Sequence, residues 1–214
     1  MSGVLIIIPA FNEEECIEAS IRDLQQSCDF DICVVNDGST DATEEIAASL
    51  GVKLATSPTN IGYSKAISMG LDYAIRHEYS TAVTFDADRQ FNSVDIHRLL
   101  MLLSPDTALV VGSRSRKQRA SEFYVGLLTA LLYKVPDPFC GFKAINLTLL
   151  RDFIAADDDS LVNTRLLSLA LRRKMNVHTV PISHQDRINT NSRFGSGIKA
   201  EIKLLKAFLK WYLR

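Results

Sequence analysis

The chain has 214 residues, of which 47% are hydrophobic and 23% charged, with a net charge of −1. These values fit one α/β domain with a sizeable core and a short appendage, and we expect no nucleic-acid partner. The four cysteines are scattered without a Cys-x-x-Cys pair, which argues against a zinc site and for reduced thiols in a cytoplasmic protein. No apolar run approaches ~18 residues, so we expect no membrane span and no signal segment.

Apolar, β-branched runs alternate with helical patterns at short spacing along the chain. The pattern predicts strands at 4–9, 31–35, 53–57, 82–86, 108–111 and 177–182, and helices at 13–24, 42–50, 63–77, 93–103, 122–133 and 161–175. Such alternation is typical of a mostly parallel central sheet flanked by helices. In these sheets, ligands bind beyond the carboxyl ends of the strands.

The most informative stretch is Thr84–Gln90, which contains the end of the predicted buried strand 82–86. Asp86 and Asp88 stand one residue apart, and an extended backbone would place both carboxylates on one side. Like charges so close favour a cation between them, and hard oxygen ligands suit Mg²⁺ or Mn²⁺ together with phosphate oxygens. The alternative is an Asx turn in which Asp88 caps the next helix.

Polar segments also follow three other predicted strands, at 9–13, 36–41 and 112–114. Four polar strand ends at one sheet edge predict a ligand cleft. The sequence has neither Gly-x-Gly-x-x-Gly nor Gly-x-x-x-x-Gly-Lys-Ser/Thr, which disfavours a dinucleotide-dependent oxidoreductase and a P-loop NTPase.

Taken in order, these segments resemble the family 2 glycosyltransferases, and most closely their dolichol-phosphate mannosyltransferase-like branch. The resemblance covers about 4–193 and rests on Ile8–Glu13, Asn36–Asp41, Asn60–Gly62, Asp86–Gln90 and Gly112–Arg114. It implies the GT-A nucleotide-diphospho-sugar transferase fold. It also implies inverting transfer of a hexose-type sugar with Mg²⁺ or Mn²⁺ as cofactor.

The resemblance also implies roles on the donor side. Asp37 would accept hydrogen bonds from the base, and Asp86 would face the ribose or the metal. Asp88 and Gln90 would hold the metal against the diphosphate, where it offsets charge on the leaving group. The nucleotide pocket would be lined by Pro9, Asn12 and Glu13. A fixed cation near the reacting atoms would be supplied by Arg114.

The acceptor side is expected in the second half of the chain. The predicted helix 122–133 carries Phe123, Leu127, Leu128, Leu131 and Leu132 on one apolar side. The segment 137–143 resembles the family's Asp…Ser-Gly-Phe segment, with Cys140 in the serine position. Asp137 is therefore the candidate base for a hydroxyl acceptor, or else a turn residue before Pro138. A phosphate acceptor is already ionised near neutral pH and needs cations rather than a base.

Those cations are predicted further along the chain. The segment 187–193 resembles the branch's Arg…Gly-x-Ser-Lys segment, with Thr190 for glycine and Arg193 for lysine. Arg187, Ser192 and Arg193 would grip an acceptor phosphate. Residues 163–165, by contrast, lack the acidic residue that relatives often carry in this helix.

We predict a catalytic domain at 1–197 and a basic amphipathic helix at 198–214. Its Lys and Arg side chains recur every three or four residues, which predicts either peripheral membrane contact, a helix packed on the domain, or a partner-binding helix.

The expected activity is sugar transfer from a nucleotide-diphosphate sugar to polyprenyl phosphate. The alternatives are transfer to a sugar hydroxyl of a surface glycan and a non-catalytic nucleotide-sugar-binding module.

Overall fold

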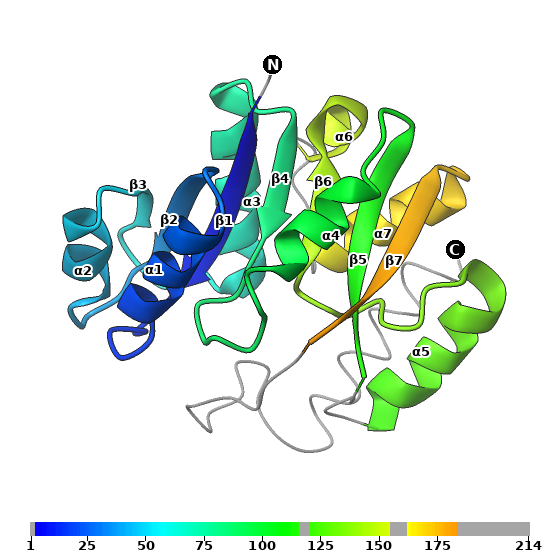
Figure 1. Ribbon diagram of the computed structural model, residues 1–214, viewed down its shortest axis with the longest axis horizontal. Coiled ribbons are helices and arrows are strands. Elements are labelled where there is room, and N and C mark those ends of the chain that lie inside the picture. The colour runs from blue at the N-terminus through cyan, green and yellow to red at the C-terminus, as the bar shows by residue number, and fades with distance from the viewer. Residues whose placement is uncertain (1–2, 116–119, 155–161, 184–214) are drawn as a thin grey trace.

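The computed structural model describes residues 3–115, 120–154 and 162–183 (Figure 1). Its seven strands form one sheet in the order β3-β2-β1-β4-β6-β5-β7. The strands are β1 (Val4–Ala10), β2 (Asp31–Asp37), β3 (Lys53–Ser57), β4 (Thr81–Thr84), β5 (Thr107–Arg114), β6 (Lys143–Asn146) and β7 (Asn176–Ile182).

Helices cover both faces of the sheet. Figure 1 shows α1 (Ile17–Ser27) and α4 (Asp95–Met101) in front of it, and α3 (Tyr63–Arg76), α6 (Leu147–Ile154) and α7 (Val162–Arg172) behind it. Two further helices lie at its flanks, α2 (Thr43–Ser49) beside β2 and β3 and α5 (Ala120–Tyr133) at the opposite side. The strand segment Leu5–Ile8 is completely buried between the layers, as its continuous β-branched run predicts.

Strand β6 gives the sheet its mixed character, because it is antiparallel to both of its neighbours. It lies between β4 and β5, so that Lys143 is paired with Thr84 on one side and Val111 on the other. An antiparallel strand begins where its neighbours end. The segment that leads into β6 therefore reaches the same edge as the carboxyl ends of β4 and β5.

The expected mostly parallel sheet flanked by helices is confirmed, with differences in detail. Helix α1 begins at Ile17 rather than at 13, and β5 continues to Arg114, so that residues 112–114 lie within this strand rather than after it. The prediction lacked β6 and α6, which are only four and eight residues long. Strand β4 ends at Thr84, so the prediction that it continues to residue 86 was wrong. Among residues 3–115, 120–154 and 162–183, none of the helices has the length and apolar character needed to cross a bilayer.

Candidate active site

The loops after β1 and β2 are tied together at the sheet edge. Asn12 adopts a positive φ of 52°, and its Oδ1 accepts a 2.9 Å hydrogen bond from the Thr40 backbone N–H. The Glu13 backbone N–H donates to Thr43 Oγ1 at 2.8 Å, and the Pro9 ring is buried within β1. These three residues lie side by side at the carboxyl end of β1, where the sequence predicts a nucleotide pocket; their contact with a nucleotide stays a prediction.

Asp37 anchors the loop that leads into α3. Its Oδ1 accepts a 2.7 Å hydrogen bond from the Ile61 backbone N–H, and its Oδ2 accepts one of 3.0 Å from Gly62. The side chain is buried, and Gly62 has a φ of +90° that suits glycine. Asp37 thus sets the start of α3, and base recognition by this carboxylate stays a prediction.

The acidic loop, defined here as residues 85–90, is a turn rather than a strand end. The Gln90 backbone N–H donates to Asp88 Oδ1 at 3.3 Å, which is the hydrogen bond of an Asx turn. Arg89 has a positive φ of 58°. Strand alternation therefore does not place the two carboxylates, and the turn alternative describes the backbone here. Asp86 is half-buried, whereas Asp88 and Gln90 are only 3% and 5% exposed.

Aromatic rings support both ends of the acidic loop. Phe85 and Phe91 flank it and both contact Phe142 of the segment entering β6, with ring centroids 5.5 and 5.1 Å from that of Phe142. From the other side, the Ser20 hydroxyl on α1 donates a 2.6 Å hydrogen bond to the Ala87 carbonyl. The loop conformation is therefore fixed by packing and hydrogen bonding before any ligand binds.

A tyrosine and a glycine from distant segments contact Asp86. The Tyr63 hydroxyl donates to Asp86 Oδ1 at 2.9 Å. Gly141 approaches so closely that an added Cβ would lie 3.0 Å from Asp86 Oδ2 and 2.9 Å from the Tyr63 hydroxyl. A larger residue at position 141 would therefore displace one of these two side chains, and the segment 137–143 packs against the acidic loop.

The oxygen atoms of the acidic loop fit a hard divalent cation whose remaining ligands are phosphate oxygens. Asp86, Asp88 and Gln90 supply oxygen atoms, which Mg²⁺ and Mn²⁺ prefer. Within the described part of the chain, no three His, Cys, Asp or Glu side chains are grouped to bind a metal by themselves. Two carboxylates suit a cation that completes its shell with water and diphosphate oxygens.

Arg114, at the end of β5, forms a buried ion pair with Asp137. Its Nε donates to Asp137 Oδ2 at 2.8 Å, a terminal nitrogen donates to Oδ1 at 3.0 Å, and its backbone N–H adds a 3.1 Å bond to Oδ2. The same terminal nitrogen lies 3.2 Å from Glu122 Oε2 on α5. Burial opposes the charge, yet the hydrogen bond and attraction from Asp137 raise the pKa of Arg114 above its ordinary value.

Lys143 and Cys140 complete this cluster. The Lys143 ammonium is fully enclosed and donates to the Cys140 carbonyl, which fixes the turn before β6. Burial lowers the pKa of Lys143 to about 8, although the Asp137 carboxylate favours its charge. Burial likewise raises the pKa of the Cys140 thiol to about 12, so the thiol is protonated at neutral pH. All four cysteines are free, as the sequence predicts.

The structure thus brings most of the predicted donor-side residues, together with Arg114 and Asp137, to one sheet edge. The predicted acceptor residues Arg187, Ser192 and Arg193, like the helix 198–214, lie outside the described residues. Sequence reasoning missed three side chains that build the site: Tyr63, Glu122 and Lys143. Tyr63 follows the singled-out Asn60–Gly62 turn directly, which was the available signal; the other two contacts depend on the placement of β6 and α5.

A comparison with protein-family models finds the description "Glycosyl transferase family 2" over residues 5–152. Among curated proteins, the UDP-N-acetylglucosamine–dolichyl-phosphate N-acetylglucosaminyltransferase of Methanococcus voltae is 28% identical over 212 residues, which span 84% of each chain. A dolichyl-phosphate hexose transferase of Haloferax volcanii is 25% identical over 224 residues, 98% of this chain and 95% of the relative.

Among solved structures, glucosyl-3-phosphoglycerate synthase of Mycobacterium tuberculosis in complex with Mn²⁺ and UDP-glucose superposes with a TM-score of 0.76. It is 21% identical and the match covers 98% of this chain and 78% of that one. The expected GT-A-like fold is thereby confirmed. The family match covers more than half of the sequence, so the chain belongs to glycosyltransferase family 2.

Proposed function

We propose that the protein is an inverting, metal-dependent glycosyltransferase that moves a hexose-type sugar from a nucleotide-diphosphate sugar to polyprenyl phosphate. Family membership and the names of the two relatives support this activity. Inversion and the type of sugar follow from the family resemblance. The geometry of the Arg114–Asp137 pair is the observation that favours a phosphate over a hydroxyl as the acceptor.

That pair bears on the acceptor because of what each kind of acceptor requires. A sugar hydroxyl needs a base that removes its proton, and a general base must present an oxygen within hydrogen-bond reach of that proton. Both oxygens of Asp137 instead bind Arg114, and Asp137 is 1% exposed. A phosphate acceptor needs no strong base, since it is already ionised. The geometry favours Asp137 as the residue that positions Arg114.

On the donor side, the acidic loop would hold a divalent cation and orient the diphosphate. Asp86, Asp88 and Gln90 would bind Mg²⁺ or Mn²⁺, which supplies Lewis-acid neutralisation of the departing diphosphate. Asn12 and Glu13, after the neighbouring strand β1, and Asp37, at the end of β2 two strands away, would shape the nucleotide end at the same edge. The rigid support of the loop keeps these oxygens in place, so little reorganisation is needed on binding.

The test is a transfer assay with the full chain, labelled UDP- and GDP-sugars, Mg²⁺ or Mn²⁺, and two acceptors in parallel. We expect label on polyprenyl phosphate in detergent, loss of transfer with EDTA, and a product anomer opposite to that of the donor. Label found only on an added oligosaccharide would overturn the phosphate acceptor. Nucleotide-sugar binding without turnover on either acceptor would indicate a binding module instead.

A further inference from the structure

Helix α5 has its large apolar side chains on the outside. Its inward positions are small or polar: Glu122, Val125, Gly126 and Thr129 are all buried. Its outward positions carry six large side chains with exposed fractions between 39% and 82%: Phe123, Tyr124, Leu127, Leu128, Leu131 and Leu132. A helix packed on a soluble domain shows the opposite distribution. We call these six residues the outer face of α5.

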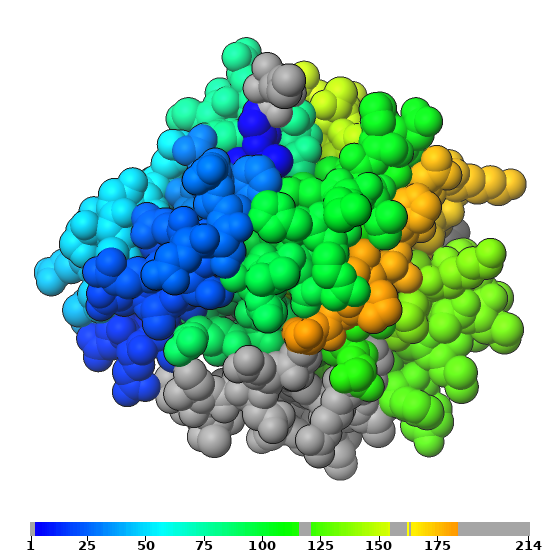
Figure 2. All heavy atoms as spheres, in the orientation of Figure 1, coloured from blue at the N-terminus to red at the C-terminus, as the bar shows by residue number. Residues whose placement is uncertain are grey.

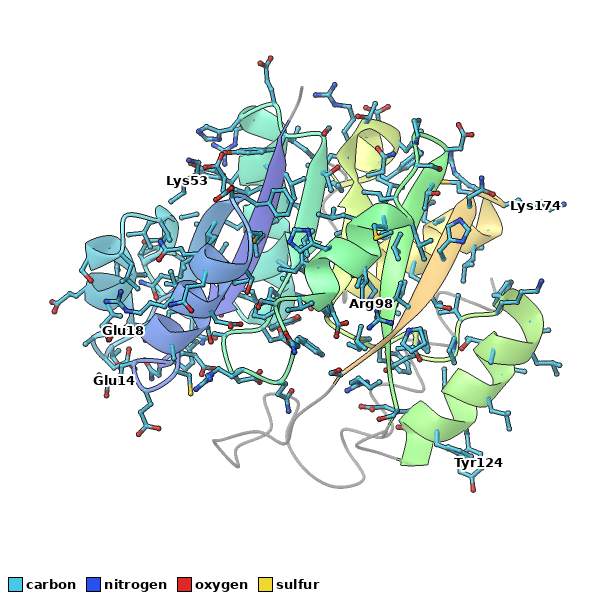
Figure 3. The ribbon with its side chains drawn as sticks, in the orientation of Figure 1. Glu14, Glu18, Lys53, Arg98, Tyr124 and Lys174 are labelled. Atoms are coloured by element: carbon cyan, nitrogen blue, oxygen red, sulfur yellow. The ribbon has the colours of Figure 1, made fainter. Side chains whose placement is uncertain are left out.

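The outer face is continuous and uncharged. Its members recur in pairs every four residues, so they form one stripe along the helix. The only charged residue within α5 is Glu122, which is turned inward and bonded to Arg114. Figure 2 shows α5 as a projecting ridge at the lower right, and in Figure 3 the Tyr124 ring points away from the domain. A contiguous exposed apolar patch of this kind marks an interaction surface.

The dimensions and chemistry of the outer face favour a lipid surface as its partner. A 14-residue helix is about 21 Å long, which is too short to span a bilayer but long enough to lie in its interface. A stable protein interface takes about 20–30 residues from each partner, many more than this stripe offers. Insertion into acyl chains requires no matching shape, and a ring such as that of Tyr124 suits the headgroup boundary.

The position of α5 links this surface to the active site. Glu122 in its first turn contacts Arg114, which also binds Asp137 at the sheet edge. We propose that the outer face of α5 docks the domain on a phospholipid bilayer, with the edge that carries Arg114 held beside the headgroups. This rests on the proposed function only in assigning a purpose, namely access to a lipid-linked phosphate; the docking itself follows from the apolar stripe.

The experiment is flotation of the full chain with vesicles of zwitterionic phosphatidylcholine, which removes electrostatic attraction by the basic residues 198–214. Leu127→Gln/Leu131→Gln is compared with Val94→Gln/Met101→Gln, which alters two exposed apolar residues around α4. Because the exchange removes two large aliphatic side chains from contact with the acyl chains, the α5 variant should partition at least about tenfold more weakly. The α4 variant should bind like the wild type.

A second measurement keeps the proposal testable if the double variant misfolds. A nitroxide attached to Leu131→Cys should become more accessible to oxygen than to a water-soluble nickel complex when vesicles are added. Docking through α5 would be overturned if all three proteins floated equally or if the nitroxide showed no change. It would also be overturned if the wild type formed a dimer and the α5 substitutions dissociated it. Transfer to polyprenyl phosphate in detergent is scored separately, so failure of docking and failure of the proposed acceptor give different results.

Discussion

The Tyr63 hydroxyl donates a 2.9 Å hydrogen bond to Asp86, and the two residues lie on segments 23 positions apart. Tyr63 is the first residue of α3, whose start is fixed by the bonds from Ile61 and Gly62 to Asp37. Three consecutive residues therefore connect Asp37, at the predicted nucleotide end of the site, with Asp86, at the predicted metal end. The orientation of Asp86 depends on this connection.

Tyr63→Phe should weaken Mn²⁺ binding about tenfold, because loss of a residue that orients a metal ligand has an effect of this order. The thermal midpoint should change little, since the ring remains. Manganese affinity is measured by electron paramagnetic resonance. The matched control is Tyr79→Phe, which removes a 2.6 Å bond to Asp31 at the opposite sheet edge and should leave Mn²⁺ affinity unchanged. Equal affinities of the wild type and Tyr63→Phe would show that this hydrogen bond does not prepare the site.

Gly141→Ala tests the same contact without removing either polar group. The new Cβ would meet both the Tyr63 hydroxyl and Asp86 Oδ2, so one of them must move. We expect weaker Mn²⁺ binding in calorimetric titration, with the secondary structure preserved in circular dichroism. Gly51→Ala is a poor control because of its φ of +70°, whereas Gly3→Ala adds a methyl group with ordinary contacts. Undiminished binding in Gly141→Ala would contradict the close packing against Asp86.

Arg114→Ala should lower the free energy of unfolding by about 3–5 kcal/mol, because it leaves the Asp137 and Glu122 carboxylates buried without their cation. Urea denaturation provides the measurement. Arg22→Ala serves as the control, since it removes an exposed ion pair with Glu18, and pairs of that kind contribute less than about 1 kcal/mol. A loss in Arg114→Ala no larger than that of the control would mean that the buried pair contributes little to stability.

Lys143 should make stability depend on pH in the alkaline range. Its pKa is about 8 in the fold and 10.5 for an unperturbed lysine side chain, so the unfolded chain binds more protons between these values. Stability therefore rises as pH increases from about 8 to 10.5, by up to about 3 kcal/mol from this group. The difference in unfolding free energy between wild type and Lys143→Met should shift in favour of wild type over this range. A constant difference would contradict the depressed pKa, and Lys174→Met provides an exposed-lysine control.

Much of the fold could be predicted from the sequence because strand and helix periodicity is strong in the first half. The buried run Leu5–Ile8 and the polar strand ends that follow each strand identify the sheet and its ligand-binding edge. Strand β6 escaped prediction, since it has four residues including a buried lysine, and antiparallel insertion leaves no local pattern. The Arg114–Asp137 pair depends on that insertion, which brings residues 23 positions apart to one edge.

Two local patterns were informative but incomplete. The prediction that Asp86 and Asp88 lie on one side of an extended strand was wrong. Strand β4 ends at Thr84, and the hydrogen bond from the Gln90 backbone N–H to Asp88 belongs to a turn. In the helix 122–133, periodicity identified the apolar side but could not show which way it faces. That direction is set by the bond of Glu122 to Arg114, which turns the opposite side of α5 inward.

The central claim is that the acidic loop binds a divalent cation together with a nucleoside diphosphate, and a calorimetric titration with Mn²⁺ and UDP or GDP tests it most directly. Asp86→Asn preserves the size of the side chain and an acceptor for Tyr63, and Asp72→Asn on the exposed surface of α3 is the control. The wild type and the control should bind Mn²⁺ more tightly when the nucleotide is present. Asp86→Asn should lose at least about tenfold in Mn²⁺ affinity. Unchanged, nucleotide-dependent Mn²⁺ binding by Asp86→Asn would contradict the claim.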